Sequence, residues 1–470
     1  MSKKLQIFSW VAVGLISGVL VSMGFSALAQ RDSKLSLPID ELRQFADVYG
    51  AIKSNYVESV DDKKLITEAI SGMLTGLDPH SAYLDADAFK ELQVGTQGEF
   101  GGLGLEVGTE DGFVRVVSPI EGTPAEKAGI KAGDLIIKID EKATKGLPLN
   151  DAVKLMRGKP KTSVTLTVSR KTVNKPLVFT IVRDIIQIQS VRSKMIEPGY
   201  GYLRITQFQE HTVENLVKHF NQLAEKGPMK ALVLDLRNDP GGLLTGAIGV
   251  SAAFLPEKTL VVSTDGRQED AKRKYFASVS DYHRAGREDP LDKLSAQAKT
   301  VPIVVLVNSG SASASEIVAG ALQDHGRAKI MGTQTFGKGS VQTILPLTSN
   351  TAIKLTTARY YTPKGTSIQA KGISPDLWVE ETADGAVTDH LRVREADLNR
   401  HLSGSESAKG KDAKDKPKAN AKANDSKPAA NDGKESKPVE FGSADDYQLQ
   451  QALNHLKGKP VATSARPDNG

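Results

Sequence analysis

Two uninterrupted apolar runs constrain the fold of this chain more than any other feature. They are residues 231–236 (Ala-Leu-Val-Leu-Asp-Leu) and residues 303–307 (Ile-Val-Val-Leu-Val). Strands that are buried on both faces have this composition, whereas strands with one wet face alternate apolar and polar residues. A helical apolar stripe precedes the first run and stops before Gly227 and Pro228. The sequence therefore predicts an α/β core, which we assign to residues 186–400.

A second pattern, of short strands punctuated by glycines, covers residues 95–185. The four strand candidates and the one short helix candidate are residues 113–117, 134–139, 164–168, 177–181 and 150–156. With 470 residues the chain is long enough for two or three domains. We predict that this β-rich domain is inserted ahead of the α/β core.

The N-terminal part contains two further kinds of segment. Residues 1–29 carry Lys3 and Lys4, a long apolar stretch and an Ala-Leu-Ala end, a pattern typical of a cleaved signal peptide. The alternative is an uncleaved signal anchor, since the apolar stretch approaches the ~20 residues that span a bilayer. Residues 38–94 have apolar side chains every three or four positions, which predicts helices. Their stripes would pack in the core or form a dimer interface.

The C-terminal part combines a polar segment with a short amphipathic one. Residues 403–440 contain no Leu, Ile, Phe, Met, Trp or Tyr, so they cannot bury enough apolar surface to fold. We predict a disordered linker over residues 401–442. Beyond it, residues 443–460 place leucines and an alanine on one helical face and end in glycine and proline. This predicted helix should dock on the core or on another chain.

Composition excludes several classes of function. The chain has no cysteine, which rules out disulfides, thiolate catalysis and zinc-cysteine sites. A net charge of +5 without a compact basic patch argues against nucleic-acid binding. Residues 332–338 nearly match a phosphate-binding P-loop, but Gly339 stands where the magnesium-binding hydroxyl belongs. We expect no cofactor and no metal.

Ser313 and Lys338 are the strongest candidates for chemistry. Ser313 lies in residues 308–316 (Asn-Ser-Gly-Ser-Ala-Ser-Ala-Ser-Glu), and Lys338 lies in residues 335–342 (Thr-Phe-Gly-Lys-Gly-Ser-Val-Gln). A serine hydroxyl is inert at neutral pH unless a neighbouring base takes its proton. A lysine can do so only if burial brings its pKa down from about 10.4 towards neutrality. The apolar flanks of Lys338 favour such burial.

Both residues also have structural interpretations. Ser313 and Glu316 fit a capping box, in which Ser313 caps a helix that runs to Asp324. This interpretation and the catalytic one can both hold in part, because a strand-turn-helix junction exposes a residue and supplies N–H groups. If residues 338–342 are extended, Lys338 and Gln342 share one face, and Gln342 could hold Lys338 towards Ser313. The alternative is an exposed lysine on a strand edge.

The segment after the first buried run, residues 235–242 (Asp-Leu-Arg-Asn-Asp-Pro-Gly-Gly), is a candidate anion site. Two glycines after a strand leave amide N–H groups open, as an oxyanion hole requires. An ordinary βα turn would have the same composition. Taken alone, the segment favours the ordinary turn.

Residues 101–105 (Gly-Gly-Leu-Gly-Leu), followed by residues 123–134 (Thr-Pro-Ala-Glu-Lys-Ala-Gly-Ile-Lys-Ala-Gly-Asp), resemble a bacterial PDZ domain. A glycine-rich loop before a strand can hold a peptide C-terminal carboxylate, and the peptide then adds as a strand to the sheet edge. The candidate peptide-binding residues are Gly102, Leu103, Gly104 and Leu105. Arg157 is a candidate ligand sensor, or simply a cation at a helix C-terminus.

Taken together, the segments around Gly242, Ser313 and Lys338 and the preceding PDZ-like domain resemble the carboxyl-terminal processing peptidases, also called tail-specific proteases. The resemblance runs from about residue 40 to residue 380, and residues 447–458 resemble the end of Gram-negative members. It implies that Ser313 is the nucleophile, Lys338 the general base and Gln342 its positioning partner. It also implies an oxyanion hole made by the N–H groups of Gly242 and Ala314.

The same resemblance implies the fold and the biology. The fold would be α/β multidomain, with a crotonase- or ClpP-like core that chain N-terminal to the PDZ domain helps to complete. The activity would be endoproteolysis of proteins bound by their C-termini, with the PDZ domain recruiting the tail and gating the site. From the leader we expect a periplasmic protein, retained by an anchor if the leader is uncleaved, and from the helical stripes at both ends we expect a homo-oligomer. Whether an adaptor or activating protein acts on it stays open.

Two alternatives from other classes stay open at this point. One is a PDZ adaptor with an inactive core, against which the intact Ser313, Lys338 and Gln342 argue. The other is a trypsin-like protease with a PDZ domain. That architecture needs a His-Asp-Ser triad, a Gly-Asn-Ser-Gly-Gly motif and a PDZ domain after the catalytic domain. Here the order is reversed and the motif is missing.

Overall fold

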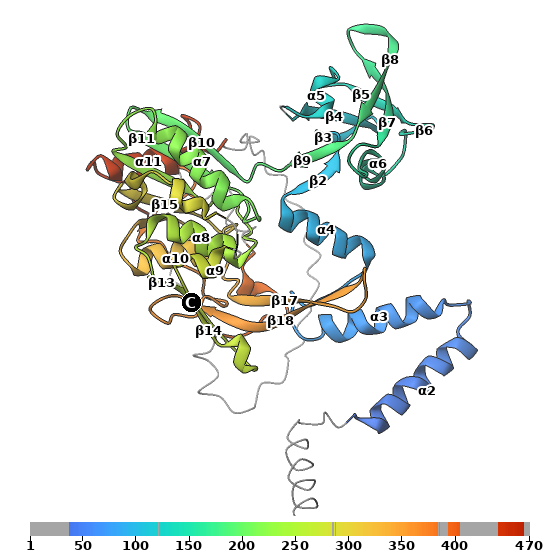
Figure 1. Ribbon diagram of the computed structural model, residues 1–470. Coiled ribbons are helices and arrows are strands. Elements are labelled where there is room, and N and C mark those ends of the chain that lie inside the picture. The colour runs from blue at the N-terminus through green and yellow to red at the C-terminus, as the bar shows by residue number, and fades with distance from the viewer. Residues whose placement is uncertain are drawn as a thin grey trace, which may run out of the picture. The chain divides into compact units, whose positions relative to one another are not determined.

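The computed structural model describes residues 37–120, 122–283, 286, 288–383, 385, 393–404 and 440–464 (Figure 1). The chain forms two compact units, Met1–Ile70 and Ser71–Gly470. The predicted signal peptide, residues 1–29, and most of the predicted linker, residues 401–442, fall outside the described residues. Within the described residues, no helix is long and apolar enough to cross a membrane.

Helices dominate the region before the PDZ-like domain. They are α2 (Ile39–Asn55), α3 (Asp62–Thr75) and α4 (Ala86–Gln97). The predicted helical region 38–94 is interrupted, because β1 (Ala82–Leu84) follows a turn at Asp78. Pro79 disfavours helical backbone in the residue before it, and the Asp78 carboxylate accepts the N–H groups of His80 and Ser81. No residue of α2 is buried.

The PDZ-like domain is a β-sheet closed by two short helices. Its strands have the order β3-β4-β5-β7-β8, with β6 paired to β5. The bounds are β3 (Leu105–Glu110), β4 (Phe113–Pro119), β5 (Leu135–Ile139), β6 (Lys142–Ala143), β7 (Ser163–Arg170), β8 (Val173–Val182), α5 (Pro124–Lys127) and α6 (Leu149–Met156). This confirms all four strand candidates and the helix candidate. β2 (Glu99–Gly102) precedes the domain and β9 (Asp184–Gln187) follows it. The two strands pair with each other as an antiparallel ribbon.

The α/β core is built on a six-stranded sheet of order β10-β11-β12-β15-β16-β19. β10 is antiparallel to β11, and the other neighbours are parallel. The strands are β10 (Val191–Glu197), β11 (Tyr200–Ile205), β12 (Ala231–Asp235), β15 (Ile303–Val307), β16 (Lys329–Gly332) and β19 (Leu377–Trp378). Every residue of β12 and β15 is buried, as their uninterrupted apolar sequences predict.

Helices cover both faces of this sheet. On one face, α7 (Thr212–Ala224), α8 (Leu244–Phe254) and α10 (Ala314–Asp324) pack against residues such as Leu232 and Val305. On the other face, α11 (Tyr447–Leu456) packs Leu449 and Leu453 against Val233 and its neighbours. The C-terminal helix therefore docks on its own core. Figure 1 shows it in red beside β10 and β11.

A second sheet stands beside the first, in the order β1-β18-β13-β14, with β17 paired to β18. Its other strands are β13 (Leu260–Gly266), β14 (Arg273–Phe276), β17 (Ser340–Pro346) and β18 (Ala352–Tyr361). The antiparallel pairing of β1 with β18 means that chain preceding the PDZ-like domain completes this sheet. The remaining elements are α9 (Val279–Tyr282) and short turns of 3-10 helix at Glu269–Ala271, Pro290–Lys293, Ala296–Lys299 and Glu395–Asp397.

Candidate active site

The candidate catalytic residues lie on loops that follow neighbouring parallel strands. β12, β15 and β16 are adjacent in the sheet and run in the same direction. Their C-terminal ends therefore meet at one edge, which is where open α/β sheets bind ligands. The loop after β12 carries Gly242, the loop after β15 carries Ser313, and the loop after β16 carries Lys338. The topology gathers three segments that are far apart in sequence.

Ser313 occupies a strained turn at the start of α10. Its φ of 55° and ψ of −110° lie in a region that residues with a Cβ seldom adopt. Gly241 passes close behind it, since a Cβ at Gly241 would lie 2.9 Å from the Ser313 Cβ. Only glycine allows that approach. The turn leaves Ser313 half-buried at a helix N-terminus, where N–H groups and the helix dipole favour negative charge.

One buried carboxylate binds the backbones of both candidate catalytic residues. Glu316 Oε2 accepts hydrogen bonds from the N–H of Ser313 at 2.8 Å and from the N–H of Lys338 at 2.9 Å. Its Oε1 accepts from the Gly337 N–H at 2.7 Å and from the Thr335 hydroxyl at 2.6 Å. The capping interpretation correctly predicted the bond to Ser313. Burial raises the pKa of Glu316 to about 7, although these hydrogen bonds oppose the rise.

Lys338 has the electrostatic setting that a lysine base needs. Burial lowers the pKa of Lys338, and the positive charge of Lys354 acts in the same direction. The carboxylates of Glu395, Glu316 and Asp78 oppose that shift without cancelling it. Among the described residues, no hydrogen bond joins Lys338 Nζ to Ser313 Oγ. The two residues are thus fixed through their backbones, with their side chains not in hydrogen-bond contact.

Residues 338–342 do not form one continuous strand, so the condition for placing Lys338 and Gln342 on one face is not met. β17 begins only at Ser340, and its pairing with β18 shifts register between Val341 and Gln342. Gly339 causes the difference, because its N–H donates to Gln369 Oε1 and its Cα packs tightly against the Gln369 backbone. The Gln342 amide donates to Ser340 Oγ at 3.0 Å and to Thr356 Oγ1 at 3.2 Å.

A chain of polar side chains surrounds the loop that carries Lys338. His80 Nε2 lies 2.7 Å from Glu395 Oε2, and Gln369 donates to Glu395 Oε1 at 2.8 Å. Burial alone would raise the pKa of Glu395, but the bonds from His80 and Gln369 and the charges nearby lower it overall. On the other side, Thr356 Oγ1 donates to Asp78 Oδ1 at 3.1 Å. Carboxylates therefore stand near the lysine without neutralising it by direct contact.

Two open N–H groups lie beside Ser313, one from Gly242 in the loop after β12 and one from Ala314 at the start of α10. Within the described residues, the N–H of Gly242 and the N–H of Ala314 have no hydrogen-bond acceptor. Gly242 has a φ of 145°, and a Cβ there would lie 2.0 Å from the Phe208 oxygen, so the loop requires glycine. The Ala312 N–H donates to the Asp239 oxygen at 3.0 Å, which ties this loop to the serine loop. The geometry therefore favours an anion site over a plain turn.

The predicted peptide-binding loop lines a small groove of the PDZ-like domain. A cavity of about 60 Å³ lies between the loop and α6, and its lining includes Gly102, Leu103, Gly104, Leu105, Val153 and Met156. β3 is an edge strand of its sheet, so its outer side can pair with an added strand. Among the described residues, the N–H groups of Leu103 and Gly104 have no acceptor. Both features suit a peptide C-terminus.

Arg157 lies at the border of this groove. It is the C-cap residue of α6, which fits a helix-terminal cation, and it also lines the cavity. Its guanidinium carbon is 4.6 Å from the centre of the Phe100 ring. Phe100 belongs to β2, the strand through which the chain enters the domain. Arg157 thus contacts both the groove and the connection to the rest of the chain.

Comparison with known proteins agrees with this arrangement. The family model described as Peptidase family S41 matches residues 199–379, and a PDZ domain model matches residues 115–170. A third model, described as the activating protease CtpB N-terminal domain, matches residues 20–88. A carboxy-terminal-processing protease of Bartonella bacilliformis is 43% identical over 459 residues, which cover 96% of this chain and 97% of the relative.

The chain belongs to the carboxy-terminal processing proteases of peptidase family S41. CtpB of Bacillus subtilis is 37% identical over 359 residues, which cover 76% of this protease and 70% of CtpB. Among solved structures, a photosystem II D1 C-terminal processing protease has a TM-score of 0.40 and 32% identity, and the match covers 71% of this chain and 86% of that one. The protein is therefore a serine-type protease with a PDZ domain that acts on protein substrates.

Several residues around the site of this protease are not evident from the sequence. The sequence predicts only a capping role for Glu316, although an acidic residue inside the otherwise apolar start of a helix is a signal for a buried role. His80, Gln369 and Glu395 come from separate parts of the chain, and no local pattern links them. Within the described residues, no group of three or more His, Asp or Glu side chains is placed to hold a metal ion.

Proposed function

We propose that this protease cleaves its substrates by acyl transfer, with Ser313 as nucleophile and Lys338 as general base. The observation that carries the proposal is the shared carboxylate of Glu316, which accepts the N–H groups of both residues. Because the same carboxylate holds both backbones, the side chains of Ser313 and Lys338 need only rotate to come within reach for proton transfer. Substrate binding completes the contact between Lys338 Nζ and Ser313 Oγ, as catalytic hydrogen bonds often tighten only in the complex.

The steps follow from the charges around the lysine. Neutral Lys338 takes the Ser313 proton while Ser313 Oγ attacks the scissile carbonyl carbon. The N–H groups of Gly242 and Ala314 hold the resulting oxyanion. The lysine ammonium then gives its proton to the leaving amine, and a water that Lys338 deprotonates releases the acyl group. Between these two proton transfers, nearby carboxylates stabilise the Lys338 ammonium, and Glu395 contributes most among them.

Gln342 acts as a positioning residue through its neighbours. It donates to Thr356 Oγ1, which in turn donates to the Asp78 carboxylate near Lys338. Loss of the Gln342 amide frees Thr356 and shifts that carboxylate. The expected effect on kcat is smaller than that of removing Lys338 itself.

The PDZ domain recruits the substrate tail and gates the site. The C-terminal carboxylate of the substrate tail accepts hydrogen bonds from the N–H groups of Leu103 and Gly104. The backbone of the tail pairs with the edge of β3. Arg157 senses the bound tail, because it lines the groove and stacks on Phe100 of β2. A tail bound in the groove thereby affects β2, the strand through which the chain enters the domain.

The predicted leader and the exposed apolar face of α2 support a proposal for location and assembly. The leader at residues 1–29 would export the protease to the periplasm and, if uncleaved, anchor it there. The apolar face of α2, with Ile39 57% exposed and Phe45 48% exposed, supports a homo-oligomer. An adaptor or activating protein would act at the same region.

Substitution of each dyad residue tests the mechanism. Ser313→Ala and Lys338→Ala should each lower kcat/KM by at least about 1,000-fold, measured on a folded protein substrate with an intact C-terminus. Lys364→Ala, at an exposed lysine, serves as the matched control and should keep full activity. Cleavage by Ser313→Ala at the wild-type rate would overturn the assignment of the nucleophile.

A further inference from the structure

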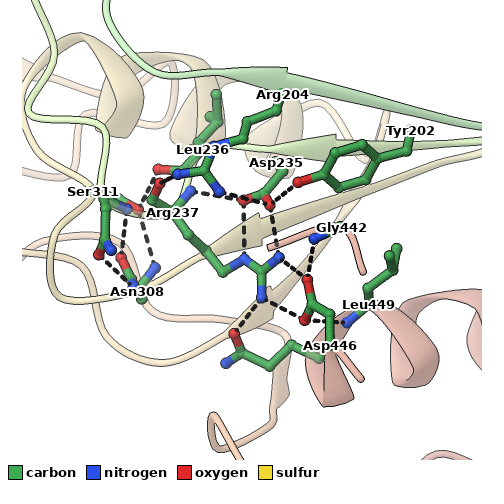
Figure 2. A network of polar contacts seen from close by, with 12 residues as sticks. Tyr202, Arg204, Asp235, Leu236, Arg237, Asn308, Ser311, Gly442, Asp446 and Leu449 are labelled. Carbon is green, nitrogen blue, oxygen red and sulfur yellow. Dashed lines mark hydrogen bonds and ion pairs between the residues drawn. The ribbon is translucent and has the colours of Figure 1, made fainter. Parts of the chain in front are cut away.

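A second cluster of buried charges lies at the base of the loop that carries Gly242. Arg237 follows β12, and only 1% of its side chain is exposed. Its Nε donates to Asp235 Oδ1 at 3.0 Å and its Nη2 donates to Asp235 Oδ2 at 2.7 Å. Figure 2 shows the guanidinium between this carboxylate and a second one. An arginine held on two sides in this way has one orientation.

The second carboxylate comes from the other end of the chain. Asp446, the N-cap residue of α11, accepts from Arg237 Nη1 at 2.9 Å and from Nη2 at 2.6 Å (Figure 2). Gln448 accepts from Nη1 at 3.0 Å. The Phe441 ring covers the guanidinium, with its centre 4.1 Å from Arg237 Cζ. We call residues 441–449 the C-terminal clasp.

The charges of this cluster balance only when the clasp is in place. Two carboxylates, Asp235 and Asp446, face two guanidinium groups, Arg237 and Arg204. Arg204 Nη1 lies 3.4 Å from Asp235 Oδ2, and its Cζ lies 4.6 Å from the centre of the Phe441 ring. Without Asp446 and Gln448, Arg237 Nη1 would lose both acceptors inside the protein, where an unpaired donor is costly.

The orientation of Arg237 is passed on to both catalytic loops. The backbone oxygen of Arg237 accepts from Arg204 Nη2 at 3.1 Å. The residue before it, Leu236, accepts from Ser311 Oγ at 2.8 Å, and the residue after it, Asn238, donates its N–H to Asn308 Oδ1 at 2.9 Å. Movement of Arg237 would therefore displace the loop that ends at Gly242 and the loop that ends at Ser313.

We propose that the C-terminal clasp is a positioning element of the active site, in which Asp446 and Phe441 act through Arg237 to aim the Gly242 N–H at the oxyanion. This rests on the proposed function, since it assigns the clasp to the oxyanion hole of the same serine. The clasp touches no reacting atom. Its loss should therefore weaken transition-state binding and leave tail binding unchanged.

The test compares Asp446→Asn with Asp445→Asn in the full chain. Asp446→Asn keeps the shape and removes the charge, whereas Asp445 is exposed and its substitution serves as the matched control. We expect Asp446→Asn to lower kcat at least tenfold with KM within twofold, and to weaken inhibition by a peptide aldehyde by a similar factor. Phe441→Leu should show a smaller loss and Phe441→Trp a partial recovery. Binding of a C-terminal peptide to the PDZ domain should not change.

Folding is followed in the same samples. Circular dichroism and thermal unfolding must show each variant folded at the assay temperature, so that activity is compared between folded proteins. A folded Asp446→Asn with kcat within twofold of the control overturns the proposal, as does a loss confined to KM. If that result comes while Ser313→Ala is inactive, the clasp proposal fails and the catalytic assignment stands. If Ser313→Ala is active, the proposed function fails instead.

Discussion

The two sides of this active site use buried carboxylates in opposite ways. On the lysine side, Glu316 is satisfied by neutral donors, three N–H groups and one hydroxyl. On the arginine side, Asp235 is paired with Arg237, as Asp446 is. Burial raises the pKa of Glu316 to about 7, whereas the guanidinium of Arg237 keeps the pKa of Asp235 below its ordinary value despite burial. Glu316 can therefore respond to pH near neutrality, whereas Asp235 stays charged.

Outside Ser313 and Lys338 themselves, the largest effect should follow removal of the carboxylate on the lysine side. Glu316→Ala leaves four donors without an acceptor, so we expect kcat to fall by more than about 100-fold through misplacement of the dyad. The free energy of unfolding should fall by about 3 kcal/mol. Steady-state kinetics and urea unfolding measure the two effects separately.

Glu316→Gln separates position from stability in the same residue. Its remaining oxygen can still accept from Thr335 and Gly337, but its NH₂ group cannot accept from Ser313 and Lys338. We expect most of the stability to return while kcat stays low. Recovery of kcat in Glu316→Gln would show that the shared carboxylate does not position the dyad.

Arg237→Lys should disrupt the ion pairs of the arginine side, and its main effect should be a lower free energy of unfolding. A lysine keeps the charge, but its three donors cannot replace the five hydrogen bonds that the Arg237 guanidinium makes to Asp235, Asp446 and Gln448. We expect the free energy of unfolding to fall by about 3 kcal/mol, which is typical of breaking a buried ion pair, and kcat to fall as well. Denaturant midpoints of wild type and variant measure the first effect. An unchanged midpoint would mean that the forked contact contributes nothing to folding.

Only substitutions on the lysine side should shift the pH profile of kcat/KM. Lys354→Met removes a positive charge that lowers the pKa of Lys338, so the rise of kcat/KM with pH should shift to higher pH. Glu395→Gln removes a charge that raises the same pKa, so its profile should shift to lower pH. Asp446→Asn should lower the plateau without moving the midpoint. Shifts of the same sign in Lys354→Met and Glu395→Gln would contradict this assignment.

The smallest effect is expected in the PDZ domain, at Arg157. Arg157→Ala loses the stacking on Phe100, worth about 0.5–1 kcal/mol at an exposed site. Cleavage of substrates with a free C-terminal tail should fall two- to fivefold, and cleavage of a tail-less peptide should not change. Equal losses on both substrates would argue against a role in sensing the tail.

The sequence predicted much of this arrangement because its strongest patterns are local. Strands such as β12 and β15 follow from uninterrupted apolar runs, and the small strands of the PDZ domain follow from the glycines between them. Ser313 and Lys338 were identified from their flanking motifs. Their shared contact with Glu316 was not predictable, because it depends on β15 and β16 being neighbours in the sheet.

The remaining parts of the site depend on long-range contacts that no sequence window contains. Asp446 reaches Arg237 across more than two hundred residues, and β1 joins β18 across the whole PDZ domain. Whether residues 338–342 form one strand could not be predicted from the sequence, because the tight packing of Gly339 against Gln369 is a tertiary contact. The sequence predicts that Glu316 accepts the N–H of Ser313 in a capping box. Its bond to the N–H of Lys338 is a tertiary contact that no local pattern shows.

Direct titration of Lys338 tests the central claim most directly. Carbon-13 labelling of lysine Cε in Ser313→Ala, assigned with Lys338→Arg, would report the pKa of this amine by NMR. We expect a value well below the ordinary one of about 10.4, equal to the midpoint of the kcat/KM profile of the active enzyme, and raised by Lys354→Met. A Lys338 that titrates at its ordinary pKa while the enzyme is fully active at neutral pH would contradict the account.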